Sequence, residues 1–179
     1  EDIWVRSHRP GDGTFYIVSG FANFNGGARF YRTFREHVDS GGRVVVFLGG
    51  SPSQRLSSKQ AVGALLECGA EVTVINRKRL LHAKCYGAVT SNRTSLVVTS
   101  GNFTGPGMSQ NLETSILDED NLLKSSQFSW SDLIAGMRSQ RWLSYGMNQQ
   151  LPDGPGWKLL YDEYLSSPQL DETEETTLV

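Results

Sequence analysis

Two basic side chains, His82 and Lys84, lie two residues apart within an apolar stretch of the sequence. The stretch runs over residues 80–89 and its composition predicts a buried strand. Side chains at positions i and i+2 of a strand point to the same face, so we expect His82 and Lys84 to project together. A strand that exposes two polar residues to water would show the same pattern. A lysine in a central strand, however, is costly without a phosphate or carboxylate partner.

Further polar residues follow the next two predicted strands. Ser100-Gly101-Asn102 ends a strand predicted over 95–100, and the glycines that follow would let main-chain amides approach an anion. Glu113 lies in a strand predicted over 112–117. Each feature alone has a simpler interpretation, because glycine-rich segments are usually plain loops and a lone glutamate on a strand is usually solvated.

Taken together, these side chains suit the cleavage of a phosphodiester bond. The reaction needs a nucleophile, a clamp for the phosphate oxygens and an acid for the leaving oxygen. His82 can serve as nucleophile or acid near neutral pH, while Lys84 and Asn102 can bind oxygens. A carboxylate such as that of Glu113 can hold an imidazole in one tautomer and stabilise its cation.

The order His82-Ala83-Lys84 followed by Ser100-Gly101-Asn102 resembles the motif of the phospholipase D superfamily, in which His-x-Lys precedes a Gly-Ser or Ser-Gly step and an asparagine. The lipid enzymes of the superfamily usually carry an aspartate five residues after the lysine, where this chain has Val89. The spacing from Lys84 through Asn102 to Glu113 resembles that of its metal-independent restriction endonucleases, of the BfiI and NgoFVII types. The resemblance extends over about residues 10–145.

The resemblance implies a metal-independent DNA endonuclease of the restriction type that needs no cofactor. His82 would attack phosphorus and form a phosphohistidine, Lys84 and Asn102 would bind the non-bridging oxygens, and Glu113 would orient His82. Ser100 would add a hydroxyl contact. Superfamily active sites combine two such motifs and this chain has one, so we expect a homodimer with the active site across its twofold axis. The second His82 would act as general acid.

Two groups of basic residues are candidates for contacts with DNA phosphates. One recurs every third residue on a predicted helix, opposite its apolar face, although a solvated charged face with Glu36 fits equally well. The other directly precedes the strand predicted over 80–89 and therefore favours a phosphate contact. Such contacts position DNA but do not read its sequence. The candidates are Arg29, Arg32 and Arg35 in the first group, and Arg77, Lys78 and Arg79 in the second.

The remaining elements alternate between strands and helices and predict an α/β layered fold with a mixed central β-sheet flanked by helices, as in phospholipase D-like proteins. After this alternation, three strands follow one another without a helix between them, and helices come last. The expected strands are 15–21, 43–48, 71–75, 80–89, 95–100 and 112–117; the expected helices are 28–39, 57–68, about 129–143 and 157–165.

Charge divides the chain into two parts. Residues 162–179 contain six of the 19 acidic residues and none of the 17 basic ones, so this end of the chain carries −6. The body, residues 1–161, has 17 basic and 13 acidic residues and carries a net +4. A mildly basic body is compatible with binding a phosphate backbone. We expect a nuclease domain over 1–165, and an acidic tail or linker over 166–179 that leads to a separate DNA-recognition domain.

Composition bounds the remaining possibilities. No apolar run is long enough for a membrane span, and Cys68 and Cys85 are too few for a secreted disulfide scaffold, so we expect reduced thiols in a bacterial or archaeal cytoplasm. The cysteines and histidines show no zinc spacing, and Pro152-Asp153 lacks the acidic residue of metal-dependent nucleases two positions before Lys158. The alternatives are a lipid phosphodiesterase and a non-catalytic α/β binding module.

Overall fold

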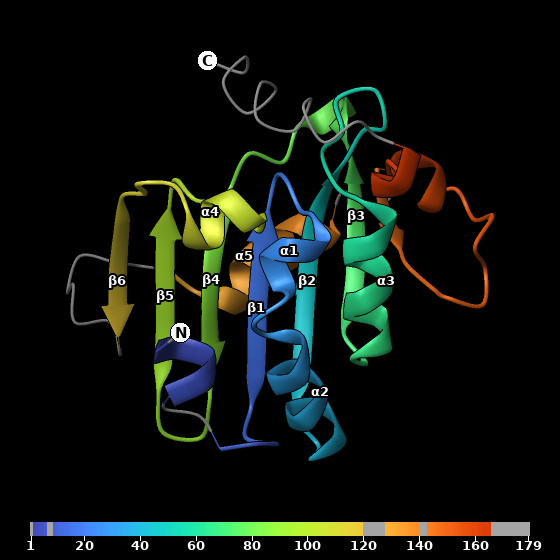
Figure 1. Ribbon diagram of the computed structural model, residues 1–179. Helices are drawn as coiled ribbons and strands as arrows, with labels where there is room; N and C mark the ends of the chain where they lie inside the picture. Colours follow the sequence, from blue (N-terminus) through green and yellow to red (C-terminus); the bar gives the residue numbers. More distant parts are fainter. Residues whose placement is uncertain (1, 7–8, 120–127, 140–142, 166–179) are drawn as a thin grey trace.

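A seven-stranded mixed sheet forms the centre of the computed structural model, which describes residues 2–6, 9–119, 128–139 and 143–165. The strands lie in the order β6-β5-β4-β1-β2-β3-β7, so the first strand of the chain is in the middle (Figure 1). The α/β layered fold with a mixed sheet that the sequence predicts is therefore confirmed.

The parallel half of the sheet consists of β1 (Thr14–Ser19), β2 (Arg43–Gly50) and β3 (Glu71–Asn76). β2 is buried from Val44 to Gly50, as a strand covered on both faces must be, and β1 and β3 are buried at four and three of their six residues. The connecting helices are α2 (Tyr31–Asp39) and α3 (Lys59–Glu67). The Ser58 hydroxyl caps α3 by accepting from the amide of Ala61.

The antiparallel half consists of β4 (Lys84–Val89), β5 (Thr94–Thr99) and β6 (Ser115–Glu119). β4 also pairs antiparallel with β1, which places Lys84 opposite Ser19. A short helix, α4 (Gly105–Ser109), connects β5 to β6. The end of β1 and the beginning of β4 therefore meet at one edge of the sheet.

Two apolar layers cover the sheet. On one face, Phe15 and Ile17 pack with the residues of α2 and α3; on the other, Val18 and Phe47 pack against α5 (Trp130–Arg138). Figure 1 shows α1 to α4 in front of the sheet and α5 behind it. We call these the front face and the back face.

Several predicted elements differ from the observed ones. The helix predicted over 28–39 begins only at Tyr31, as α2, and a separate short helix with two glycines, α1 (Phe24–Gly27), precedes it. The helix predicted to about residue 143 ends at Arg138, and β7 (Ser144–Gly146) follows and pairs with β3. Three residues are too short for a strand to show a period in the sequence.

Short turns take the place of the other predicted terminal helix. The segment 157–165 contains two 3-10 turns, η3 (Trp157–Leu159) and η4 (Glu163–Leu165), instead of one α-helix. A π-helical turn, η1 (Asp2–Arg6), opens the described chain. The predicted acidic tail, 166–179, lies outside the described residues, and the domain boundary at 165 remains a prediction.

Two smaller expectations concern membranes and thiols. Within the described ranges the longest helices have nine residues, and none has the length and apolar character to cross a membrane. Both cysteines are free thiols, as expected; Cys68 is buried and Cys85 is half-buried. Burial raises the pKa of each thiol above its ordinary value.

Candidate active site

The edge where β1 ends and β4 begins carries His82 and Lys84. β4 begins at Lys84, so the prediction that His82 lies inside this strand is wrong by two residues. His82 lies in the segment before β4, and its side chain is exposed. Gly20 follows β1 and allows this segment to come close, because a Cβ on Gly20 would lie 2.7 Å from the carbonyl oxygen of Leu81.

The two basic side chains nevertheless lie side by side. Lys84 Nζ is 3.5 Å from His82 Nε2 and 3.4 Å from the carbonyl oxygen of His82. If the ammonium group donates to Nε2, that nitrogen carries the imidazole lone pair and the proton lies on Nδ1. A nucleophilic nitrogen and a cation that can hold an anion then share one small area.

Asn102 lies on a turn that is fixed from both sides. The Ser19 hydroxyl on β1 accepts a 2.9 Å hydrogen bond from the amide of Phe103 and donates to the carbonyl of Phe21 at 2.7 Å. The Tyr86 hydroxyl on β4 donates to the carbonyl of Gly101 at 2.9 Å. The residues before and after Asn102 are therefore attached to the two strands that meet at the site.

The side chain of Asn102 has an unsatisfied polar atom. Its Oδ1 is buried and has no hydrogen-bond partner within the described part of the chain. Leaving a buried polar atom unpaired costs free energy, on the order of 1–3 kcal/mol, so a donor such as a water molecule or a ligand group is expected beside Oδ1. Because Oδ1 is an acceptor, a phosphate oxygen would be bound by the Nδ2 donors of Asn102.

Glu113 precedes β6 instead of lying within it, contrary to the predicted strand over 112–117. The Ser100 hydroxyl donates to Oε2 of Glu113, and Asn111 Nδ2 donates to Oε1 at 3.2 Å. The amide of Thr114 donates to the Ser100 hydroxyl at 3.1 Å. In the described structure the hydrogen bonds of Glu113 therefore go to Ser100 and Asn111, and its role in orienting His82 stays a prediction.

Sequence reasoning missed two residues that position the site, Ser19 and Tyr86. Ser19 is a fully buried hydroxyl at the end of an apolar strand, and that unusual position was the only available signal. Tyr86 is also buried, and burial raises its pKa well above the ordinary value, so its hydroxyl stays protonated and can donate to Gly101.

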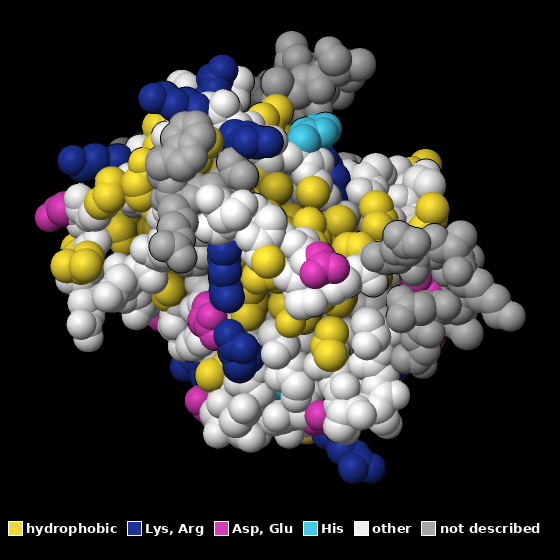
Figure 2. Space-filling model, turned by 180° about the vertical axis from the view of Figure 1, so that it is seen from behind, with side chains coloured by type: hydrophobic (Ala, Val, Ile, Leu, Met, Phe, Trp, Pro, Cys, Tyr) yellow, Lys and Arg dark blue, Asp and Glu magenta, His cyan; other side chains and the backbone are white. Residues whose placement is uncertain are grey.

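The two predicted basic groups lie in different places. Arg77–Arg79 form an exposed 3-10 turn, η2, at the end of β3, only a few residues before His82. Lys and Arg side chains gather at this end of the back face (Figure 2). The exposed Arg32 and Arg35 lie on α2, and the exposed Arg29 lies just before it. α2 leads to the start of β2, which is at the opposite edge of the sheet from the site. Arg32 also forms an ion pair with Glu36 at 3.7 Å. The structure does not bring the two groups together.

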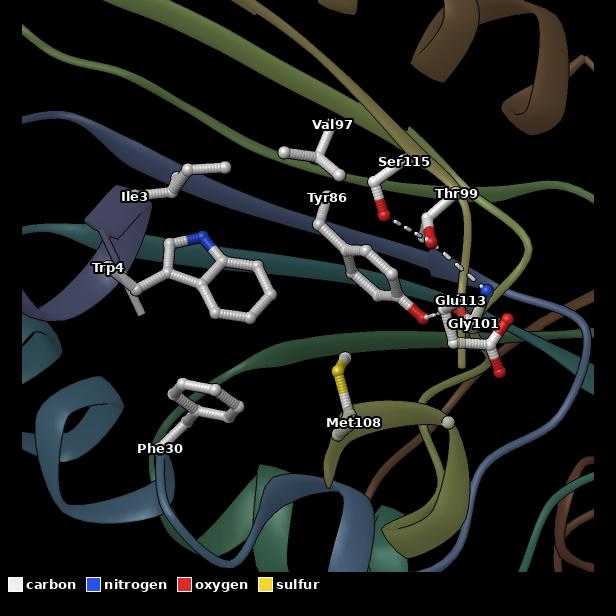
Figure 3. A pocket seen from close by; sticks show the side chains of 11 residues that line it. Ile3, Trp4, Phe30, Tyr86, Val97, Thr99, Gly101, Met108, Glu113 and Ser115 are labelled. Atoms are coloured by element: carbon white, nitrogen blue, oxygen red, sulfur yellow. Dashed lines mark hydrogen bonds between the residues drawn. The ribbon is translucent and has the colours of Figure 1, made fainter. Parts of the chain in front are cut away.

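A hollow of about 180 Å³ lies on the front face next to the site. Figure 3 shows Trp4 and Phe30 at one end of the hollow, Gly101 and Glu113 at the other, and the ring of Tyr86 between them.

No group of three or more His, Cys, Asp or Glu side chains that could hold a metal ion occurs among the described residues. The side chains described at this edge are an imidazole, an ammonium, an amide and a carboxylate.

Comparison with known proteins identifies the fold. No protein-family model and no curated protein matches the sequence. Among solved structures, the chain is similar to Nuc from Salmonella typhimurium, with a TM-score of 0.52 and 12% identity over 78% of this chain and 84% of that one. Polyphosphate kinase from Porphyromonas gingivalis matches with a TM-score of 0.46 and 13% identity over 75% of this chain and 22% of that one, which is too weak to support an argument. The protein therefore has the α/β fold of Nuc, a member of the phospholipase D family.

Proposed function

We propose that this protein is a metal-independent phosphodiesterase that cleaves DNA through a covalent intermediate on His82. The observation that carries the proposal is the 3.5 Å approach of Lys84 Nζ to His82 Nε2 at the edge that also holds the turn with Asn102. The fold shared with Nuc, a phospholipase D family member, supports it. The order of the motif residues favours the endonucleases of that superfamily over its lipid enzymes, because Val89 stands where the latter carry an aspartate.

The reaction has two displacement steps. The Nε2 lone pair of His82 attacks phosphorus, the bond to the leaving oxygen breaks, and that oxygen takes up a proton. Water then attacks the phosphohistidine and gives its proton to the group that protonated the leaving oxygen in the first step, the P–N bond breaks, and the imidazole is regenerated. Lys84 and Asn102 bind the non-bridging oxygens and stabilise the charge that develops on them in both steps.

The carboxylate of Glu113 holds the imidazole in the required tautomer. Ser100 and Asn111 donate one hydrogen bond to each of its oxygens, which fixes the carboxylate in place. A carboxylate offers about four acceptor positions, so it retains capacity for the imidazole Nδ1 proton. In this proposal Ser100 acts by positioning Glu113, and its contact with the phosphate is secondary.

A homodimer supplies the second histidine. The chain carries one copy of the motif, and a twofold axis through the site would place the His82 of a second copy opposite the first, as general acid for the leaving oxygen. Light scattering coupled to size exclusion should give twice the mass of the chain. A monomer that stays monomeric during turnover would contradict this part of the proposal.

Basic residues outside the site bind the DNA backbone. Arg77, Lys78 and Arg79 are the stronger group, because η2 lies at the same edge as His82; Arg29, Arg32 and Arg35 would need DNA that extends across the front helices. We also propose that residues 166–179 connect this domain to a separate recognition domain, which would give the enzyme its restriction specificity. Alanine substitutions in η2 should weaken binding to all DNA sequences equally.

Plasmid nicking in the presence of EDTA tests the proposed reaction. The wild-type protein should nick DNA with chelator present, and His82→Ala should abolish cleavage while DNA binding remains. Lys84→Ala should also be inactive, whereas Lys59→Ala, which removes an exposed lysine at the start of α3, should retain wild-type activity. Activity that disappears with EDTA and returns with magnesium would refute the mechanism. Release of phospholipid head groups without nicking would identify the lipid enzyme.

A further inference from the structure

The hollow beside the site is lined by aromatic and apolar side chains. Trp4, Phe30 and Tyr86 are each more than nine-tenths buried, and Ile3, Val97 and Met108 complete its apolar part. Trp4 meets Phe30 and Tyr86 edge to face, with ring centroids 5.2 and 5.8 Å apart. The polar atoms of both large rings are already used, since Trp4 Nε1 donates to the carbonyl of Gly87 and the Tyr86 hydroxyl donates to that of Gly101. These walls therefore offer apolar and aromatic contact.

The other end of the hollow belongs to the site. Gly101 and Glu113 line it, and Gly101 is the neighbour of the proposed phosphate ligand Asn102. The hydroxyls of Thr99 and Ser115 lie at the same end and are bonded to each other at 2.8 Å, which leaves the Thr99 hydroxyl proton and a Ser115 lone pair for a ligand (Figure 3). A ligand that fills the hollow would thus touch the segment that carries Asn102.

The strand register places the hollow on the same face as the reacting groups. Lys84 and Tyr86 are two residues apart on β4, so their side chains share the front face. Tyr86 forms part of the hollow and Lys84 part of the site. A phosphate held at Lys84 and Asn102 therefore has the hollow directly beside it.

We propose that the hollow binds one unpaired nucleobase of the substrate, next to the phosphate that is cleaved. This inference rests on the proposed function and adds a substrate class to it, namely nucleic acid with a base free to leave the stack. Bases displaced from a duplex are bound by stacking between aromatic and apolar side chains, with a few hydrogen bonds to their edges. The hollow has both features.

Its size favours a base over a lipid chain. Cavities of about 150 Å³ in proteins hold a single ring such as benzene, and this hollow has about 180 Å³. One pyrimidine ring fits such a space, whereas a long acyl chain does not. The basic turn at Arg77–Arg79 near the same edge also matches the polyanionic backbone of a nucleic acid.

Binding of the protein to two phosphodiester probes that have the same charge tests the inference. The first probe is a ten-nucleotide oligodeoxycytidylate, and the second is an abasic phosphodiester chain of the same length. Affinities are measured by fluorescence anisotropy with the His82→Ala protein, so that neither probe is cut. If a base occupies the hollow, the oligonucleotide should bind roughly 5- to 150-fold more tightly than the abasic chain. Equal affinities would overturn the inference.

A pair of substitutions on β5 locates the base. Val97→Phe, introduced into the His82→Ala protein, places a ring in the hollow and should reduce the preference for the oligonucleotide to near unity, while affinity for the abasic chain stays unchanged. Val98→Phe is the matched control, because Val98 is the next residue, faces the back and is 45% exposed, so the preference should persist. An undiminished preference in a folded Val97→Phe protein would overturn the inference.

Cleavage separates this inference from the proposed function. With the wild-type protein, equal cleavage of both probes would keep the phosphodiesterase and refute the base site. Preferential binding of the oligonucleotide without any cleavage would keep the base site and refute the enzyme. Competition for binding by a phospholipid in place of the oligonucleotide would show a lipid site and overturn the inference.

Discussion

The hydroxyl of Tyr86 donates a 2.9 Å hydrogen bond to the main-chain carbonyl of Gly101, fifteen residues away. Tyr86 is fixed in the centre of the sheet by the pairing of β4 with β1 and β5. Gly101 precedes Asn102 in the turn after β5. This bond therefore transmits the rigidity of the sheet to the turn that holds the proposed phosphate ligand.

Replacing Tyr86 by Phe should loosen this turn. The carbonyl of Gly101 loses its donor inside the protein, which should destabilise the fold by about 1–3 kcal/mol. A displacement of Asn102 by a fraction of an ångström should also lower kcat by about tenfold to a hundredfold. Denaturant unfolding and plasmid nicking measure the two effects.

Tyr31→Phe is the matched control for this prediction. The Tyr31 hydroxyl donates to the carbonyl of Phe24, also at 2.9 Å, and this bond joins α2 to α1 instead of holding Gly101 next to Asn102. This variant should cleave DNA at the wild-type rate per folded molecule. Equal losses of kcat in both variants would show that Tyr86 has no specific role in positioning Asn102.

Ser100 and Glu113 should act as one unit. Because the Ser100 hydroxyl donates to the Glu113 carboxylate, Ser100→Ala frees the carboxylate to rotate, and Glu113→Gln removes its charge. In a double-mutant cycle on kcat, the loss in the double variant should be smaller than the sum of the two single losses by about 0.5–3 kcal/mol. Additive losses would mean that Ser100 acts on the phosphate independently of Glu113.

Asp12 should make the stability of the fold sensitive to acid. Its carboxylate accepts from the amide and the hydroxyl of Ser91, both at 2.9 Å, and these bonds lower its pKa below the ordinary value of 3.8. A lowered pKa means that the ionised form is favoured in the folded state, so this stabilisation is present above pH 3.8 and is lost as the pH falls through the folded pKa.

Thermal melting between pH 7 and pH 2 measures this effect. Asp12→Asn should melt slightly below the wild type at pH 7, and its melting temperature should fall less steeply in the acid range. Asp153→Asn, in an exposed loop before η3, serves as control and should follow the wild type. Parallel curves for Asp12→Asn and the wild type would show that the Asp12–Ser91 bonds do not stabilise the fold.

The sequence could predict six of the seven strands and the proximity of His82 to Lys84, because both depend on local patterns. The β-branched run that forms β2 and the spacing of His82 and Lys84 need no knowledge of distant residues. The exact ends of short strands could not be predicted in this way. Glu113 lies in an apolar stretch that resembles a strand, yet β6 begins at Ser115, because the Ser100 hydroxyl holds the residues before it.

Long-range hydrogen bonds were beyond the reach of sequence patterns. The bond from the Phe103 amide to the Ser19 hydroxyl joins residues 84 positions apart, and it depends on β1 and β4 being neighbours in the sheet. The hollow at Tyr86 likewise brings together residues from η1, α4 and three strands. No local signal marks such residues until the strand order is known.

The stereochemistry of cleavage at phosphorus should show net retention of configuration. Water that attacked the phosphodiester directly would invert it, and it would need a general base beside the phosphate. Glu113 is the carboxylate of the motif, and in the proposed mechanism it holds the imidazole of His82. A path through His82 reuses one bound imidazole, first as nucleophile and then as leaving group, so phosphorus is inverted twice. Cleavage of a chiral phosphorothioate in isotopically labelled water, followed by analysis of the product, distinguishes the two paths. Retention would agree with the phosphohistidine, whereas inversion, or a His82→Ala protein that cleaves at a near-normal rate, would exclude it.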